Sequence, residues 1–301
     1  MNRATVLLDA PSNLGLRPPA PGTVPGCHKL AGALRDQGLA VGLGAREGGV
    51  VTPPRYDRGT WREGDGVFHA AAIAGYSRRL ADRLQPLLAA GEFPVVLGGD
   101  CSILLGAAVA LRRLGRYGLA YLDASADLRH PGNSTAVGAA AGEGLAHVTG
   151  RGQDDVTDIE HLRPYVRDED VRVLGIRDGD PDLPELAGHG IRYATAGSIR
   201  ARGAEHSARE ALERLESAEL DGFWLHLDAD VLDPAVMPAV DSPDPGGLGV
   251  AELTGLVTVL ARSPRCVGLH LTIYDPDLDP EGTGAALLAE LLTVSLGGAR
   301  T

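Results

Sequence analysis

Two apolar segments of this chain each end in a pair of aspartates, and this pattern constrains the fold more than any other feature. Asp123 and Asp127 follow one such segment, and Asp228 and Asp230 follow another. Apolar runs of this kind are typical of parallel strands covered on both faces. Open α/β sheets bind their ligands at the carboxyl ends of such strands. We therefore expect the four carboxylates to meet at one edge of a sheet.

Carboxylates that meet in this way repel one another, and a divalent cation is the usual compensation. Each aspartate alone has a simpler explanation, because Asp is common after a strand as a cap or turn residue that accepts backbone N–H bonds. Two clusters at equivalent strand ends favour a metal site. Side chains alternate between the faces of a strand, so His226, Asp228 and Asp230 are predicted to point the same way.

The rest of the chain alternates between strand-like and helix-like segments, which predicts a mostly parallel, doubly wound α/β sheet. Strands are expected at 4–8, 40–43, 93–97, 117–122, 171–176, 191–194, 223–227 and 266–273. Helices are expected at 25–37, 67–90, 103–114, 204–218, 250–262 and 285–294, and surface loops at 48–66 and 130–152. A length of 301 residues with 44% hydrophobic content suits one α/β domain over 1–301.

Composition restricts the partners and the compartment. A net charge of −12 argues against nucleic acid or anionic membrane as a partner, since both require basic patches. The three cysteines, Cys27, Cys101 and Cys266, are odd in number and widely spaced, which fits a reducing cytoplasm better than a disulfide framework. The N-terminus lacks the apolar region of a signal peptide, and no apolar run reaches about 18 residues. We expect a soluble cytoplasmic protein.

Five motifs, in order and spacing, resemble those of the arginase and agmatinase ureohydrolases. They are Gly-Gly-Asp-Cys-Ser at 98–102, Asp-Ala-Ser-Ala-Asp at 123–127, Gly-Ile-Arg-Asp-Gly-Asp at 175–180, His-Leu-Asp-Ala-Asp-Val-Leu-Asp-Pro at 226–234, and Pro-Ala at 238–239 with Gly-Gly-Leu at 246–248. The resemblance implies a three-layer α/β/α sandwich with a parallel eight-stranded sheet. It also implies a homo-oligomer, a trimer or hexamer, and a small-molecule substrate.

In the family, two Mn(II) ions share a bridging hydroxide that attacks a guanidinium carbon and releases urea. Carried over by the resemblance, the ligands of the first ion are Cys101, Asp123, Asp127 and Asp228, and those of the second are Ser125, Asp123, Asp228 and Asp230. The family has histidine where this chain has Cys101 and Ser125. A serine hydroxyl is a poor ligand, and a thiolate moves the preference from Mn towards Zn or Fe. The second site is therefore expected to be weak or empty, and the chain could bind one ion or none.

Two further positions depart from the family's chemistry. The family's proton-shuttling histidine aligns with Val137, and its guanidinium-binding glutamate aligns with Ile273. Neither side chain can transfer a proton or pair with a cation. Glu143 or His130 could take over these roles. The family's aspartate that contacts the substrate amino group is matched by Asp180, which makes Asp180 the predicted substrate-binding residue.

His226 is a candidate compensation for the missing histidines. It could enter the vacated ligand position or serve as a general base with Asp230, or it could be a histidine that is only hydrogen-bonded within the sheet. His270 has the same alternatives, and Cys101 could simply pack, as buried free cysteines often do. Asp100 and Asp233 are expected to bond backbone or to orient neighbouring groups.

Three functions fit these observations. The first is a divergent metal-dependent hydrolase that acts on a C–N bond of a guanidino, amidino or related small molecule, supported by the four retained aspartates. The second is a repurposed scaffold of specialised metabolism with one metal or none, supported by Val137 and Ile273. The third is a catalytically silent subunit. Ordinary arginase or agmatinase activity is not expected from any of them.

Overall fold

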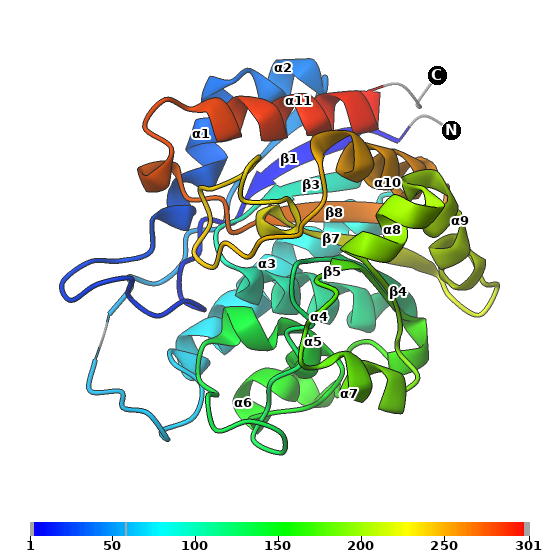
Figure 1. Ribbon diagram of the computed structural model, residues 1–301. Helices are drawn as coiled ribbons and strands as arrows, with labels where there is room; N and C mark the ends of the chain where they lie inside the picture. Colours follow the sequence, from blue (N-terminus) through cyan, green and yellow to red (C-terminus); the bar gives the residue numbers. More distant parts are fainter. Residues whose placement is uncertain (1–2, 58, 298–301) are drawn as a thin grey trace.

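The computed structural model describes residues 3–57 and 59–297, and its centre is one parallel sheet of eight strands (Figure 1). The strand order is β2-β1-β3-β8-β7-β4-β5-β6. The strands are β1 Thr5–Asp9, β2 Arg46–Val50, β3 Phe93–Leu97, β4 Tyr117–Leu122, β5 Val171–Ile176, β6 Arg192–Thr195, β7 Gly222–Asp228 and β8 Cys266–Thr272. The expectation of an α/β fold with a parallel eight-stranded sheet is confirmed.

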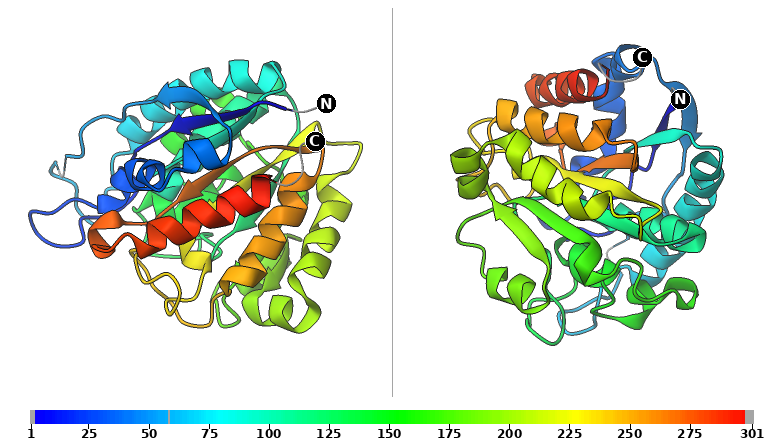
Figure 2. Two further views of the ribbon diagram at one scale, coloured as in Figure 1. Left: turned by 90° about the horizontal axis from the view of Figure 1, so that it is seen from above. Right: turned by 90° about the vertical axis from the view of Figure 1, so that its right-hand side faces the viewer.

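Helices cover both faces of the sheet and complete three layers (Figures 1 and 2). One face is covered by α1 Leu30–Asp36, α2 Leu39–Gly42, α8 Ala196–Arg202, α9 Ala204–Leu215, α10 Val250–Arg262 and α11 Thr283–Gly297. The other is covered by α3 Ala70–Ala89, α4 Leu104–Leu114, α5 Gly144–Val148, α6 Asp154–Thr157 and α7 Leu183–Gly188. A separate apolar core fills each interface between sheet and helices. None of the helices within residues 3–57 and 59–297 combines the length and the hydropathy of a bilayer span.

The predicted strand at 40–43 is wrong. Its apolar residues form the short helix α2, and the strand lies a few residues later, at β2 Arg46–Val50. β2 is an edge strand in which only Gly48 is buried, so it carries no apolar run that could reveal it. The predicted helix at 25–37 begins as a 3₁₀ turn, Gly26–Lys29, before α1.

The strands that carry the acidic motifs are neighbours at the centre of the sheet. β3, β8, β7 and β4 are consecutive in the strand order. Leu122 pairs with Leu227, and Asp228 pairs with Thr272, so β4, β7 and β8 end at the same level. This register brings the residues after each strand to one edge.

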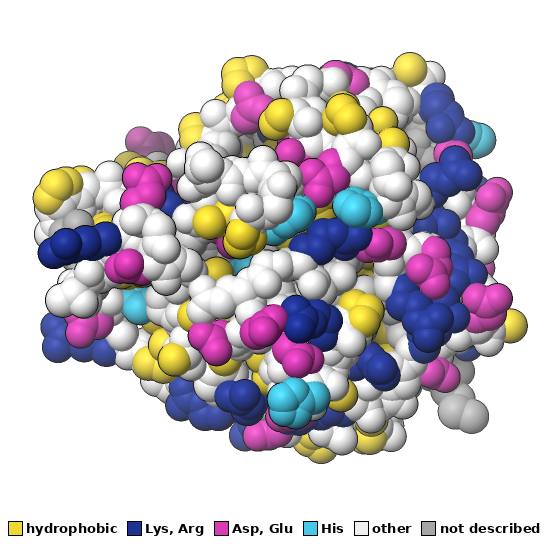
Figure 3. Space-filling model, turned by 90° about the horizontal axis from the view of Figure 1, so that it is seen from below, with side chains coloured by type: hydrophobic (Ala, Val, Ile, Leu, Met, Phe, Trp, Pro, Cys, Tyr) yellow, Lys and Arg dark blue, Asp and Glu magenta, His cyan; other side chains and the backbone are white. Residues whose placement is uncertain are grey.

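Acidic and basic side chains are interspersed over the face of the molecule drawn in Figure 3.

The turn after β3 is held against the loop after β1 by close backbone packing at Gly99. The N–H of Asp100 donates to the carbonyl oxygen of Ser12 at 3.0 Å. A Cβ atom built on Gly99 would lie 1.6 Å from that same oxygen. A residue without a side chain is therefore required here, just before the segment that carries Cys101.

We expect Gly99→Ala to destabilise the protein by at least about 1–3 kcal/mol, because the added methyl group forces the two loops apart. Urea unfolding followed by circular dichroism measures this change. Gly75→Ala in α3 is the matched control, because a Cβ atom built on Gly75 has nothing within 4 Å. That control should leave stability unchanged or raise it by up to about 1 kcal/mol through helix propensity. Equal midpoints for the two variants would contradict the steric argument.

Candidate metal centre

Four side chains from different parts of the chain meet in the buried interior at the carboxyl edge of the sheet. They are Cys101, Asp123, His226 and Asp228. One ligand atom from each lies within 4.8 Å of the others, and all four residues are buried. Cys101 comes from the turn after β3, Asp123 follows β4, and His226 and Asp228 belong to β7. Burial of two carboxylates at this separation is costly unless protons or a cation compensate their charge.

Asp123 and Asp228 divide their oxygens between the backbone and the cluster. One oxygen of Asp123 accepts from the N–H of Ser125, and one oxygen of Asp228 accepts from the N–H of Asp230, both at 2.8 Å. The second oxygen of Asp123 lies 3.4 Å from Nε2 of His226. The second oxygen of Asp228 lies 2.7 Å from Sγ of Cys101. Each aspartate thus accepts a backbone N–H bond in a turn and also belongs to the cluster. The turn role and the metal-ligand role expected from the sequence are therefore compatible.

Asp127 joins this region from a strained backbone position. Its φ of 45° lies in the left-handed region, and its Oδ2 accepts from the hydroxyl of Tyr121 at 2.7 Å. Its N–H is directed to Oγ of the half-buried Ser125 at 3.3 Å. The loop after β4 therefore folds back on itself so that Asp127 stays beside the cluster.

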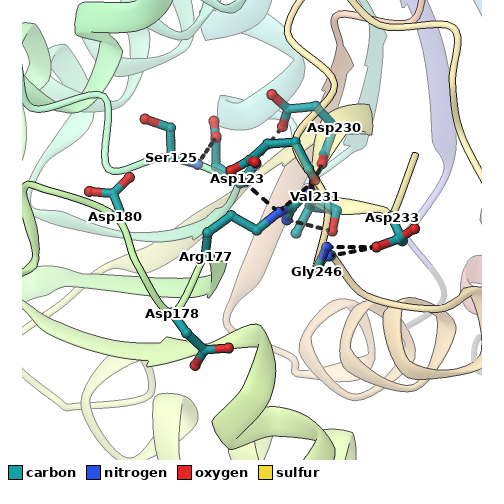
Figure 4. Close-up of polar contacts among 12 residues, drawn as sticks. Asp123, Ser125, Arg177, Asp178, Asp180, Asp230, Val231, Asp233 and Gly246 are labelled. Carbon is teal, nitrogen blue, oxygen red and sulfur yellow. Dashed lines mark hydrogen bonds and ion pairs between the residues drawn. The ribbon is translucent and has the colours of Figure 1, made fainter. Parts of the chain in front are cut away.

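Asp230 is not placed by strand alternation. β7 ends at Asp228, and Asp230 lies in the 3₁₀ turn Ala229–Val231. Its Oδ1 accepts from the N–H of Ala124 at 3.3 Å, which links the loop after β7 to the loop after β4 (Figure 4). Strand alternation therefore applies to His226 and Asp228, which both lie in β7, but it does not apply to Asp230.

Burial and mutual repulsion raise the pKa values of the acids in this cluster in its metal-free state. Desolvation raises the pKa of Asp123 and of Asp228 well above the usual range, and neighbouring carboxylates add to the effect. Desolvation also raises the pKa of Asp127 to about 7. Burial, followed by the charges of Asp228 and Asp123, raises the pKa of the Cys101 thiol well above its ordinary value. Without a cation, the carboxyl groups of this cluster therefore hold their protons to a higher pH than separate, solvated aspartates would.

Arg177 is a supporting residue whose role the sequence did not reveal, although it belongs to one of the five motifs. Its guanidinium is buried and donates to the carbonyl oxygens of Asp230, Val231, Leu232 and Asp244 at 2.7–3.2 Å (Figure 4). It therefore clamps the loop that carries Asp230. Backbone acceptors leave no pattern of side chains in the sequence. The Arg of the Gly-x-Arg-Asp motif was therefore the one available sign of this role.

Asp180 lies at an open cavity beside the cluster. The cavity has a volume of about 530 Å³, and its acidic lining residues are Asp178, Asp180, Asp230 and Asp244, with Ser125 and Arg177 alongside. The Asp180 carboxylate accepts from the N–H groups of Asp182 at 2.8 Å and of Ala126 at 3.2 Å. It is therefore held in place at the cavity wall, close to the loop of Asp123 and Ser125 (Figure 4).

The other residues singled out in the sequence have contacts away from the cluster. Buried Glu143 lies 3.3 Å from His147 and accepts from the N–H of Gly138, while His130 pairs with Glu185 at 3.0 Å. These contacts do not support either residue as a replacement proton shuttle. Asp100 accepts from the Ser102 N–H and the Ser12 hydroxyl, and Asp233 accepts from backbone N–H groups of residues 235, 246 and 247. Both have the backbone-binding role expected of them.

Comparison with known proteins identifies the family. Residues 22–297 match the arginase family, and the chain therefore belongs to it. It is 28% identical over 300 residues to the arginase of Brevibacillus brevis, covering 99% of both chains. It is 30% identical over 284 residues to the arginase of Agrobacterium fabrum, covering 91% of this chain and 86% of the relative. The native arginase structure from Bacillus caldovelox at pH 5.6 superimposes with a TM-score of 0.87 and 26% identity over 98% of each chain. The resemblance read from the five motifs is confirmed at the level of family and fold.

The raised carboxyl pKa values have a consequence for stability in the metal-free protein. A carboxyl with a higher pKa in the folded than in the unfolded state stabilises the fold below the unfolded pKa, and this contribution is lost as the pH rises through the folded pKa. For Asp127 this window runs from its ordinary 3.8 to about 7. In EDTA, we expect the contribution of Asp127 to the urea midpoint to fall as the pH is raised across this window.

Asp127→Asn should weaken this pH dependence, because the amide has no proton to lose. The exposed Asp36→Asn is the control and should keep the wild-type profile. Urea titrations at several pH values measure both. Identical pH profiles for Asp127→Asn and the wild type would show that Asp127 does not retain its proton.

Proposed function

We propose that the protein is a metal-dependent hydrolase that acts on a C–N bond of a guanidino, amidino or related small molecule. The observation that carries this proposal is the buried convergence of Cys101, Asp123 and Asp228, with Asp127 beside them. Three carboxylates and a thiol in one buried region have no packing reason to be together, and a bound cation would compensate their charge. Membership of the arginase family supports the reaction class.

The donor set fits one divalent cation better than the family's pair of Mn ions. Sγ of Cys101 and one oxygen each of Asp123 and Asp228 already lie close together, whereas Asp230 lies outside this group and the Ser125 hydroxyl oxygen accepts from the N–H of Asp127. A soft thiolate combined with hard carboxylates favours Zn or Fe over Mn. We propose that the first metal position is retained and that the second, which depends on Ser125, is weak.

The chain's own residues would bind and orient the substrate. The acidic wall formed by Asp178, Asp180 and Asp244 would attract a cationic group from solvent. Arg177 would keep Asp230 and its loop in place while the substrate binds. A bound cation would lower the pKa of a water molecule and so make a nucleophile available at neutral pH. The same family membership suggests a homo-oligomer, which size measurements in solution can test.

A second candidate function is a different reaction on the same scaffold, in specialised metabolism. The observation in its favour is Ile273, which is buried with a φ of 74° at the end of β8, where the resemblance expects a cation-binding glutamate. The side chain of Val137 has no group that could transfer a proton, and its carbonyl oxygen accepts from Arg17 at 3.2 Å. Condensation or rearrangement of a less cationic substrate would require neither missing group.

We expect Cys101→Ala to lower the amount of Zn bound per chain, because it removes a thiolate from the proposed ligands. Cys266→Ala is the matched control: Cys266 is also buried, but it lies at the start of β8 and its thiol is directed to the Gly268 carbonyl oxygen. Elemental analysis after dialysis measures the metal content. Unchanged stoichiometry in a folded Cys101→Ala protein would reject Cys101 as a ligand.

We expect little or no urea from arginine or agmatine with added Mn, because loss of a proton shuttle and of a charge-binding group each costs on the order of a hundredfold. A panel of guanidino, amidino and amide compounds, assayed with Zn, Fe or Mn for urea and ammonia, tests the proposed reaction class. Asp228→Asn serves as the metal-deficient control. Arginine turnover at ordinary enzyme rates would overturn the first expectation. Release of neither product from any member of the panel by metal-loaded protein would favour the alternative reaction.

A further inference from the structure

Three ring side chains form a buried hydrogen-bonded series that leads to the metal centre. Nε1 of Trp224 donates to Nδ1 of His270 at 2.9 Å. Nε2 of His270 is hydrogen-bonded to Nδ1 of His226, and Nε2 of His226 lies 3.4 Å from Oδ2 of Asp123. His226 and His270 are paired across β7 and β8, and all three rings are at most 1% exposed. Nothing in the mechanism proposed above uses this series.

The indole at one end determines where the protons lie. An indole nitrogen only donates, so Nδ1 of His270 has to accept and cannot carry a proton. A histidine with a bare Nδ1 carries its proton on Nε2, and His270 therefore donates to Nδ1 of His226. That nitrogen is then also bare, so the proton of His226 lies on Nε2 and faces Asp123. The same constraint excludes a doubly protonated ring at either position, because each Nδ1 is occupied as an acceptor.

We propose that Trp224 and His270 lock His226 in the Nε2–H form, so that His226 is a positioning donor to Asp123 and not a metal ligand. The distances from His226 to Cys101, Asp123 and Asp228 are short enough for all four side chains to bind one ion. Its lone pair, however, points to His270 and away from the cluster. The stacked ring of Tyr121, with centroids 4.3 Å apart, keeps the His226 plane in this orientation.

The lock has a consequence for the metal. To ligate through Nε2, His226 would have to move its proton to Nδ1, which would force His270 to place an N–H against the indole N–H of Trp224. Two buried donors would then face each other without an acceptor. The effect on metal binding depends on the proposed metal site, whereas the positions of the protons follow from the hydrogen bonds alone. A cation would then be held by Cys101, Asp123 and Asp228 from this group, while His226 orients the Asp123 carboxylate.

Long-range ¹H–¹⁵N correlation spectra of histidine-labelled, metal-free protein test the lock directly. We expect His226 and His270 each to show a protonated Nε2 and a bare Nδ1. Nuclear Overhauser effects from the Trp224 indole proton distinguish the His270 ring from the His226 ring without any substitution. A proton on Nδ1 of either ring would overturn the proposal. Titration with Zn²⁺ should leave the proton of His226 on Nε2, and its replacement by metal would also overturn the proposal. Failure of Zn²⁺ to bind, with the tautomers as expected, would sustain the lock and reject the metal site.

Trp224→Phe removes the donor that starts the series. We expect both tautomers of the pair to become populated, and Zn²⁺ to bind about tenfold more tightly as His226 becomes available, because the cost of an unpaired buried donor is no longer imposed. Trp61→Phe is the matched control, since its indole donates to the Gly66 carbonyl oxygen at 2.8 Å in a surface loop. It should leave the tautomers and the Zn²⁺ affinity unchanged. Unaltered tautomers in folded Trp224→Phe would contradict the proposal. If that variant does not fold, the wild-type spectra decide.

Discussion

Electrostatic repulsion between buried carboxylates at adjacent strand ends is the constraint on which the rest of the structure depends. Asp123 and Asp228 are brought together by the shared register of β4 and β7, and each is fixed by one backbone N–H. Arg177 holds the next loop, and the absence of a side chain at Gly99 lets the Cys101 turn approach. Much of the surrounding architecture therefore maintains an arrangement that protons or a cation must stabilise.

The fold was largely predictable because central parallel strands are buried on both faces and are therefore apolar throughout. β3, β4 and β5 have the predicted bounds. β2 was missed since an exposed edge strand has no such run, and α2 took its place in the prediction. The aspartates of the site were identifiable from their position after strands. The direction of Asp230 was not, because it depends on where β7 ends.

The Trp224–His270–His226 series could not be predicted from the sequence. His226 and His270 are 44 residues apart, and their contact depends on the β7–β8 register. Sequence spacing therefore left ligand, base and structural roles equally open for His226. Family membership cannot decide among them either, because function belongs to the site and not to the scaffold. The proposed role of His226 follows from the indole nitrogen of Trp224, which can only donate a hydrogen bond.

The turn that follows β8 combines backbone strain with burial in the core. Ile273 has a left-handed backbone, which for a β-branched residue costs about 1–3 kcal/mol. The conformation persists because its N–H is bonded to the Gly99 carbonyl oxygen and that of Asp275 to the Ala239 carbonyl oxygen. The Ile273 side chain is also buried in the apolar core, so main-chain bonds and side-chain packing together hold this turn. A polar group at this position would therefore have to replace buried apolar contacts as well as tolerate the strained backbone.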